Sequence, residues 1–383
     1  MYGVPVKPSL LGLLVGLVAC DQDYQVVAQP PDVQPEDVTE CGFTRIEGTA
    51  FWRYDCNPVF TSTGEDWADT IGTTAFNVTE VVGHPFYQLW YTGLVDDGSS
   101  FPPYAMGYAI SPDGTTFTPN DANPVLEQST GDAFDSDYMS GNQLVWDPDT
   151  EQYVMIWQGI HDDVNPSKIV DALGVATSAD GLKWTRYAKN PVFDLGSDAN
   201  RKLNYCWPLD LTLGDVSGYT GYVAGSSTSA SGGSFCEVYK LNASSLGQWD
   251  ASENVVLPVG ADGAWDDTGM TAMSIAALNG QRYMFYVGFS DWTRSGNYQI
   301  ATHAFMGMAS YSDKKGDWEK EAEPIPVNMT EEGEVNGVEA LAVGTRIHLW
   351  ITDNYGDDKK GEQGVGYFIF DPDRAAEEEA AGG

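Results

Sequence analysis

The chain has 383 residues, 42% hydrophobic and 20% charged, which is the composition of an ordinary globular protein. Its 19 basic and 56 acidic residues give a formal net charge of −37, which repels phosphate backbones and argues against a nucleic-acid partner. Such acidity also disfavours binding to anionic lipids and to anionic polysaccharides. We expect no cofactor, although local acidic clusters leave structural calcium open.

Residues 1–20 are predicted to be a lipoprotein signal peptide. Lys7 supplies a small positive charge, and residues 10–19 form an apolar stretch too short to span a bilayer as a mature helix. The stretch ends in Leu17-Val18-Ala19-Cys20, which resembles the bacterial lipobox, where the cysteine is acylated. An ordinary signal peptide with a chance cysteine is the alternative. We expect lipidation at Cys20 and a location in the cell envelope, lipid-anchored to a membrane and exposed to the periplasm or the extracellular side.

Residues 21–44 are predicted to be a flexible tether, because the segment is polar and rich in proline. Four other cysteines follow, and an even number in an exported protein indicates two disulfides. Three pairings can be drawn. We favour the two that join cysteines close in sequence, Cys41–Cys56 and Cys206–Cys236.

Five internal repeats, spaced 64 to 69 residues apart, indicate the fold over residues 45–373. The repeated element begins at Asn57-Pro58-Val59, Asn123-Pro124-Val125 and Asn190-Pro191-Val192, with looser copies at Asn254 and Glu323. Four short strands separated by turns fit each repeat, which is typical of a propeller blade. The sequence therefore predicts an all-β, five-bladed β-propeller with four-stranded antiparallel blades.

The turn between the third and fourth strands of a repeat reads Ser111-Pro112-Asp113-Gly114 and again Ser178-Ala179-Asp180-Gly181. Its Asp-Gly pair suits a hairpin turn, and we assign it a structural role. Residues 52–60 match residues 184–193, so they resemble a fourth strand whose blade is missing locally. We expect this N-terminal strand to close the last blade beside residues 364–370. Residues 374–383 are predicted to be a disordered acidic tail.

These repeats resemble the arabinanase, β-xylosidase and fructosidase clan of glycoside hydrolases, with family 43 the nearest. The resemblance covers roughly residues 45–372 and rests on the Ser-x-Asp-Gly turns, the Asn-Pro-Val elements and Trp90-Tyr91-Thr92-Gly93. It implies three carboxylates on inner strands around an axial channel: an aspartate base, an aspartate that tunes a pKa, and a glutamate acid. Such motifs specify a fold better than an activity.

Inverting glycoside hydrolysis places an acid and a base on opposite sides of the scissile bond. The acid must be kept protonated by burial or by a neighbouring carboxylate. Candidate carboxylates lie in or before the expected inner strands: Asp66, Asp69, Asp135, Asp137, Asp210, Asp266, Asp267 and Glu339.

The resemblance favours Asp69 as base, Glu339 as acid and Asp137 as the residue that sets the acid's protonation. Glu339 interrupts an apolar pattern and stands in a Glu-Ala context similar to that of the family's acid. The sequence departs from the family in two respects. The family's acid lies in the third blade and Glu339 in the fifth repeat, and no Asp-Pro pair accompanies Asp69.

We expect a pocket at one end of the propeller axis, entered by the loops around residues 65–72, 132–140, 200–210, 262–270 and 334–339. Residues near these loops are candidates for substrate binding: Trp67, Tyr138, Tyr205, Trp207, Trp265 and Asp267. The four histidines lack metal-binding spacings, so no metal site is expected. Blade packing is the alternative for each aromatic residue.

Three functions are compatible with this sequence. The first is a surface glycosidase acting on an oligo- or polysaccharide, and the second is a noncatalytic cell-surface propeller that binds glycan or protein. The third is a structural envelope lipoprotein. Carbohydrate is the expected partner of a monomeric chain that reaches the membrane only through its lipid. Converging carboxylates at one mouth of the channel would favour the first function.

Overall fold

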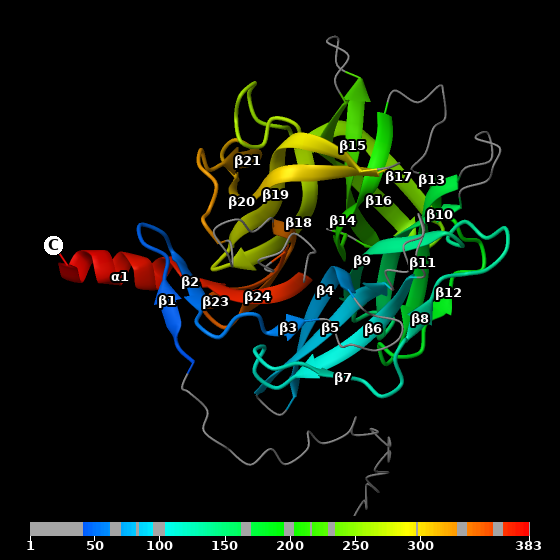
Figure 1. The fold of residues 1–383 in the computed structure, drawn as a ribbon, viewed down its shortest axis with the longest axis horizontal. Helices are drawn as coiled ribbons and strands as arrows, with labels where there is room; N and C mark the ends of the chain where they lie inside the picture. Colours follow the sequence, from blue (N-terminus) through cyan, green and yellow to red (C-terminus); the bar gives the residue numbers. More distant parts are fainter. Residues whose placement is uncertain are drawn as a thin grey trace, which may run out of the picture. The chain divides into compact units, whose positions relative to one another are not determined.

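β-strands and the turns and loops that join them make up nearly all of the described part of the computed structural model (Figure 1). It describes residues 41–61, 70–81, 84–94, 104–161, 170–194, 203–214, 217–228, 234–295, 298–327, 335–354 and 363–382. The chain divides into residues 1–40 and 41–383, and all the described strands and the described helix belong to the second unit. The predicted signal, Cys20 and most of the tether therefore lie outside the described residues. No helix among the described residues is long and apolar enough to cross a membrane.

Two five-stranded antiparallel sheets follow one another early in the chain. The first sheet contains β4 (Thr70–Val81), β5 (His84–Leu94), β6 (Tyr104–Ser111), β7 (Thr118–Pro119) and β8 (Leu126–Glu127). The second contains β9 (Tyr138–Asp147), β10 (Gln152–His161), β11 (Val170–Ser178), β12 (Thr185–Arg186) and β13 (Phe193–Asp194). In the first sheet β7 and β8 both pair with β6, at successive positions along it. In the second sheet β12 and β13 pair with β11 in the same way.

An eight-stranded sheet comes next, and it consists of two runs of four antiparallel strands. A single parallel residue pair, Cys236 with Gly269, joins the runs. The first run is β14 (Leu203–Leu213), β15 (Tyr219–Thr228), β16 (Ser234–Ser245) and β17 (Gln248–Leu257). The second is β18 (Gly269–Leu278), β19 (Gln281–Ser295), β20 (Tyr298–Ser312) and β21 (Asp317–Lys320).

The last sheet is built from both ends of the described chain. Three of its strands are C-terminal: β22 (Val335–Val343), β23 (Arg346–Asn354) and β24 (Gln363–Phe370). Three are N-terminal: β1 (Phe43–Arg45), β2 (Phe51–Tyr54) and β3 (Phe60–Thr61). Phe51 pairs with Phe370, and Phe60 pairs with Val365. The predicted pairing of the N-terminal strand with residues 364–370 is therefore confirmed.

The first strands of the five runs, β4, β9, β14, β18 and β22, are called the inner strands here. Each contacts the next along the chain, and β22 contacts β4, so the series of contacts returns to its start. The ribbon places β4, β9, β14 and β18 around the middle of the view (Figure 1). Side chains on different inner strands can therefore meet although they are far apart in sequence.

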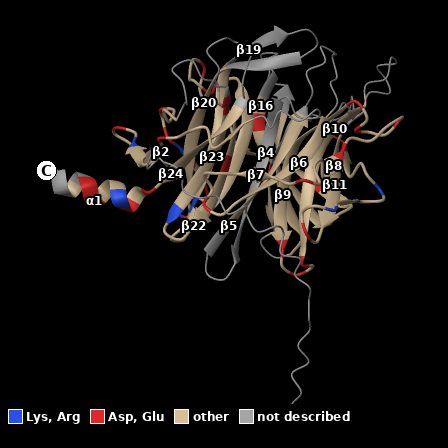
Figure 2. Ribbon diagram, turned by 60° about the horizontal axis from the view of Figure 1, so that its bottom comes forward, with Lys and Arg blue, Asp and Glu red and all other residues tan. Residues whose placement is uncertain are grey.

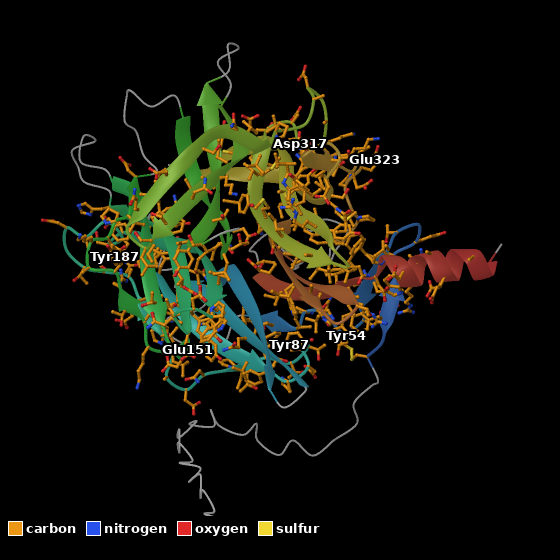
Figure 3. The ribbon with its side chains drawn as sticks, turned by 180° about the vertical axis from the view of Figure 1, so that it is seen from behind. Tyr54, Tyr87, Glu151, Tyr187, Asp317 and Glu323 are labelled. Carbon is orange, nitrogen blue, oxygen red and sulfur yellow. A yellow bond between two sulfur atoms is a disulfide. The ribbon has the colours of Figure 1, made fainter. Side chains whose placement is uncertain are left out.

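Apolar side chains fill the spaces between neighbouring sheets. Trp90 and Met106 of the first sheet, for example, pack with Met155 and Trp157 of the second. Another cluster joins the last sheet to the first and includes Tyr87, with Tyr54 packed against it (Figure 3). Acidic residues lie mostly on loops at the sheet edges, where water solvates them (Figure 2).

The asparagine of each Asn-Pro-Val element completes the edge of its sheet. The side-chain amide of Asn190 donates to the carbonyl oxygen of Val175 (2.9 Å) and its oxygen accepts from the same residue's N–H (3.0 Å). Asn123 bonds to Tyr108 in the same way, and Asn57 to Tyr367. The side chain of each asparagine thus makes the two hydrogen bonds that a backbone residue of a paired strand would make. This role explains why the asparagine recurs in the repeats.

The structure tests one predicted disulfide and corrects the predicted tail. Cys41 and Cys56 are bonded, with Cα atoms 5.7 Å apart, so this pairing is confirmed. The side chain of Cys206 lies outside the described residues, so its pairing with the buried Cys236 stays a prediction.

Where disorder was expected over residues 374–383, the structure has helix α1 (Pro372–Gly382). Asp371 caps this helix by accepting a hydrogen bond from the Arg374 N–H (3.0 Å), and Pro372 suits its first position. Ala and Glu are strong helix formers, and Arg374 bonds to Glu378 one turn later (2.9 Å).

Candidate functional site

Three inner strands bring together three nearly buried polar side chains. Gln143 lies on β9, Asp210 on β14 and Glu339 on β22, and they are 8%, 7% and 6% exposed. Gln143 hydrogen-bonds to Glu339, and the charge of Asp210 acts on Glu339. Residues 143, 210 and 339 thus meet between strands that belong to different sheets.

Asp210 is held by backbone donors on two strands. Its carboxylate accepts hydrogen bonds from the N–H of Leu211 (2.7 Å) and from the N–H of Ile275 on β18 (3.1 Å). A bulge between Pro208 and Asp210 interrupts the pairing of β14 with β15 at this point. Burial raises the pKa of Asp210 to about 7, although the two N–H donors favour the ionised form.

Glu339 stands in the middle of its strand with apolar neighbours. The next residue, Ala340, donates its N–H to the hydroxyl of Ser274 on β18 (3.0 Å). This hydrogen bond joins β22 to β18 beside Glu339. Burial raises the pKa of Glu339 well above its usual range, and the nearby Asp210 carboxylate raises it further, while the Gln143 hydrogen bond lowers it. The raised pKa favours the protonated form of the Glu339 carboxyl group, which is the form that can donate a proton.

The Asp137 carboxylate contacts a histidine of the second sheet. One of its oxygens lies 2.9 Å from Nδ1 of His161, the last residue of β10. Among the described carboxylates, the one that acts on the pKa of Glu339 is that of Asp210. Asp66, Trp67 and Asp69 lie outside the described residues, and so do the side chains of Tyr205 and Trp207.

Asp135 and Asp266 occupy equivalent places in two repeats, where they join strands. Asp135 is fully buried, forms an ion pair with Arg186 and accepts a bond from the indole of Trp157 (3.2 Å). Asp266 accepts bonds from Lys320 (2.6 Å) and from the hydroxyl of Tyr286 (3.1 Å). Both carboxylates thus connect the loop before an inner strand to the second and fourth strands of the same run.

The aromatic residue before each of these aspartates packs on its own sheet. A Cβ at Gly288 would lie 2.7 Å from the ring of Trp265, and one at Gly307 would lie 2.6 Å away. Trp265 also stacks on Tyr286, with ring centroids 5.6 Å apart. These contacts account for Trp265 through packing, and Phe134 packs in the same way against Gly159 and Gly174.

The two remaining predicted binding residues have local partners. Asp267 accepts bonds from the Gly263 N–H (2.8 Å) and the Thr268 hydroxyl (3.1 Å), so it orders the loop before β18. Tyr138 begins β9 and meets Tyr104 edge-on, with ring centroids 4.7 Å apart. Both residues are partly exposed.

Sequence reasoning missed Gln143. The residue lies next to a β-bulge where the register of β9 and β10 shifts, and nothing in its local motif marks it. Its strand also contains Ser140, Asn142 and Asp147, so its polarity did not distinguish it either. In the part of the chain that the structure describes, no group of three or more His, Cys, Asp or Glu side chains is arranged to hold a metal ion.

No protein-family model and no curated protein matches the sequence. Solved structures do match. A glycosyl hydrolase from Bacteroides ovatus is 17% identical, with a TM-score of 0.55, covering 87% of this chain and 94% of that one. A β-1,2-mannobiose phosphorylase from Listeria innocua is 11% identical, with a TM-score of 0.54 and coverage of 85% and 98%.

A third match, a β-fructofuranosidase of family GH32 from Bombyx mori, is 14% identical, with a TM-score of 0.54 and coverage of 82% and 62%. At such identities the likeness shows the fold alone. The chain therefore has a nearly all-β fold shared with propeller-type glycoside hydrolases and phosphorylases. The resemblance to family 43 in particular stays a prediction.

Proposed function

We propose that the chain is a five-bladed β-propeller whose N-terminal strand closes the last blade, and that it hydrolyses glycosidic bonds. The closed series of contacts among the five inner strands supports the blade number. The buried Glu339 beside Asp210 is the observation that supports the activity. Protonated carboxylic acids buried next to a second carboxyl group are typical of glycosidase acids.

In the proposed reaction, Glu339 is the general acid. Its proton passes to the glycosidic oxygen as the bond to the anomeric carbon breaks, and a water molecule adds to that carbon. Burial favours the protonated form of Glu339, and the nearby Asp210 carboxylate adds to this effect. Asp69, which precedes β4 in the sequence, remains the proposed base that takes a proton from the water.

Hydrolysis assays with a matched pair of variants test this proposal. Arabinan, xylan and fructan fragments and β-1,2-mannobiose are incubated with the wild type, with and without inorganic phosphate, since one structural neighbour is a phosphorylase. Glu339→Gln should lower the rate on the order of 10²–10⁴-fold while binding persists. Glu323→Gln, at the exposed position labelled in Figure 3, should change nothing. Saccharide binding by the wild type without turnover would support a noncatalytic binding propeller instead.

We also propose that the protein is exported and anchored by lipid at Cys20. The apolar stretch ending at residue 19 and the polar segment after it support this location. Mass spectrometry of the mature N-terminus should find an acylated Cys20. A mature chain that starts elsewhere, with no lipid, would contradict the anchor.

A further inference from the structure

A second cluster of titratable side chains lies where β9 begins and β10 ends. The imidazole of His161 has its Nδ1 2.9 Å from a carboxylate oxygen of Asp137 and 2.8 Å from the hydroxyl of Ser136. The hydroxyl also lies 3.3 Å from the same carboxylate oxygen. Asp137 therefore favours the tautomer with a proton on Nδ1, which leaves a lone pair on Nε2.

The arrangement differs from that of a serine hydrolase. In such an enzyme the serine hydroxyl meets one ring nitrogen and the carboxylate meets the other. Here both groups meet Nδ1, so Nε2 has no contact with the serine that it would have to deprotonate. Among the described residues, no hydrogen-bond partner occupies Nε2. Two neighbours thus orient the ring through Nδ1.

The fold does not require an ionisable pair at this place. Asp135 and Asp266 are equivalent, and so are Gly159 and Gly288, so Thr268 corresponds to Asp137 and Ser290 to His161. In that repeat the Thr268 hydroxyl bonds to the carbonyl oxygen of Ser290 (2.9 Å) and to the Asp267 carboxylate (3.1 Å), so the loop is held without a histidine. The pair of Asp137 and His161 is therefore an addition to the repeat, and structural need alone does not explain it.

The surroundings suit a sugar. The side chain of Gln128 accepts a hydrogen bond from the Tyr104 N–H (2.7 Å) and donates one to the Ser136 carbonyl oxygen (2.7 Å). These two bonds hold the edge of the first sheet beside the cluster. The Tyr104 and Tyr138 rings meet at the start of their strands. The side chains of His161 and Asp137 are 19% and 34% exposed. Partly exposed aromatic rings beside oriented polar groups are typical of small-molecule sites.

We propose that His161, oriented by Asp137 and Ser136, forms an accessory saccharide-binding site with Tyr138. Nε2 of His161 accepts a hydrogen bond from a sugar hydroxyl. The ligand is a neutral saccharide, because the partly exposed Asp137 and the net charge of −37 oppose an anionic one. The inference rests on the proposed glycan-active function and names a second point of contact, on a different pair of strands from Glu339.

Calorimetric titration of the full chain tests the site, with Glu339→Gln as the parent to prevent turnover. The probes are xylohexaose, arabinohexaose, a fructan hexasaccharide and β-1,2-mannobiose. His161→Asn keeps an amide near Nδ1 and removes Nε2, so Kd for a bound probe should rise about 3–10-fold, the loss of one neutral hydrogen bond. Thr268→Val, at the equivalent place in the other repeat, should leave Kd unchanged.

A direct readout avoids dependence on variant folding. In the parent chain labelled with ¹⁵N-histidine, the bound probe should shift the Nε2 resonance of His161 more than its Nδ1 resonance. An unchanged Kd in folded His161→Asn, or an unmoved Nε2 resonance, would overturn the accessory site while the Glu339 result stands. A parent that binds none of the probes would overturn both the site and the proposed function.

Discussion

The indole nitrogen of Trp350 donates a hydrogen bond to the carbonyl oxygen of Gly114, 236 residues earlier in the chain (3.0 Å). Trp90 and Gly181 repeat this contact between the first and second sheets (2.8 Å). Each Ser-x-Asp-Gly turn is thus held by a tryptophan on the second strand of the preceding sheet. The turns join neighbouring sheets as well as neighbouring strands.

The first prediction concerns the glycine of this turn. Gly181 has φ +74°, and a Cβ there would lie 2.5 Å from the ring of Trp90. Gly131 has nearly the same φ, +73°, with nothing near its missing Cβ. Gly131→Ala should lower the free energy of unfolding by about 1–2 kcal/mol through backbone strain. Gly181→Ala should cost about 1–3 kcal/mol more through overpacking, as measured by urea denaturation. Equal losses would show that the tryptophan contact contributes nothing.

The second prediction concerns the asparagine that completes a sheet edge. Asn190→Ala removes both hydrogen bonds to Val175 and should lower the free energy of unfolding by about 1–3 kcal/mol. Asn254 begins a looser copy of the same element, and its side chain is exposed. Asn254→Ala should therefore change the stability by less than about 0.5 kcal/mol. Chemical denaturation of the two variants side by side checks the contrast, and similar losses would contradict the structural role.

The third prediction concerns pH. The folded pKa of Asp210, about 7, lies above the ordinary value near 4 of the unfolded chain. Its contribution to stability is full below pH 4 and is lost as the pH rises through 7, because the folded state then holds a proton that the unfolded state has released. The free energy of unfolding should therefore fall by on the order of 4 kcal/mol between pH 4 and pH 8 because of Asp210. Asp210→Asn should remove this pH dependence.

Denaturation midpoints over that pH range measure the slope. Glu377→Gln, at an exposed position of α1, should keep the slope of the wild type. His348 acts in the opposite direction, since burial lowers its pKa to about 4 and the folded state loses stability as the pH falls from 6.5. A slope unchanged by Asp210→Asn would mean that Asp210 does not hold a proton in the folded chain.

The fourth prediction concerns the C-terminal helix. Asp371 caps α1 and also accepts a bond from Arg346 on β23 (2.7 Å). Asp371→Ala should lower the melting temperature and cost about 0.5–2 kcal/mol as a lost cap, with a further loss from Arg346. Glu377→Ala, on the exposed surface of the same helix, is the control and should have almost no effect. A helix signal and melting temperature unchanged by Asp371→Ala would contradict the cap.

Local patterns predicted the parts of the fold that depend on short-range chemistry. The spacing of the Asn-Pro-Val elements located the strand edges because the asparagine itself makes the edge bonds. The match between residues 52–60 and 184–193 predicted the pairing with β24. The helix also had a readable signal, Asp371-Pro372 before an alanine-rich segment, but its acidity was interpreted as disorder.

The neighbours of Glu339 could not be predicted from the repeats. Which side chains meet between inner strands depends on register, and bulges shift the register beside Gln143 and at Asp210. Asp137 was placed correctly before its strand, yet its contact is His161. Trp265 was a candidate for substrate binding with blade packing as the alternative, because the sequence shows its place before the inner strand but not its contacts with Gly288 and Gly307 on other strands.

The sheet shared by the two ends of the described chain also constrains synthesis. Asn57 bonds to Tyr367, which is 310 residues away, so β3 has no partner when it leaves the ribosome. At about 5–20 residues per second, translation needs roughly 15–60 s to reach that partner. Throughout this interval β2 and β3 lack their shared partner β24, and the sheet edge that it later covers is accessible to chaperones.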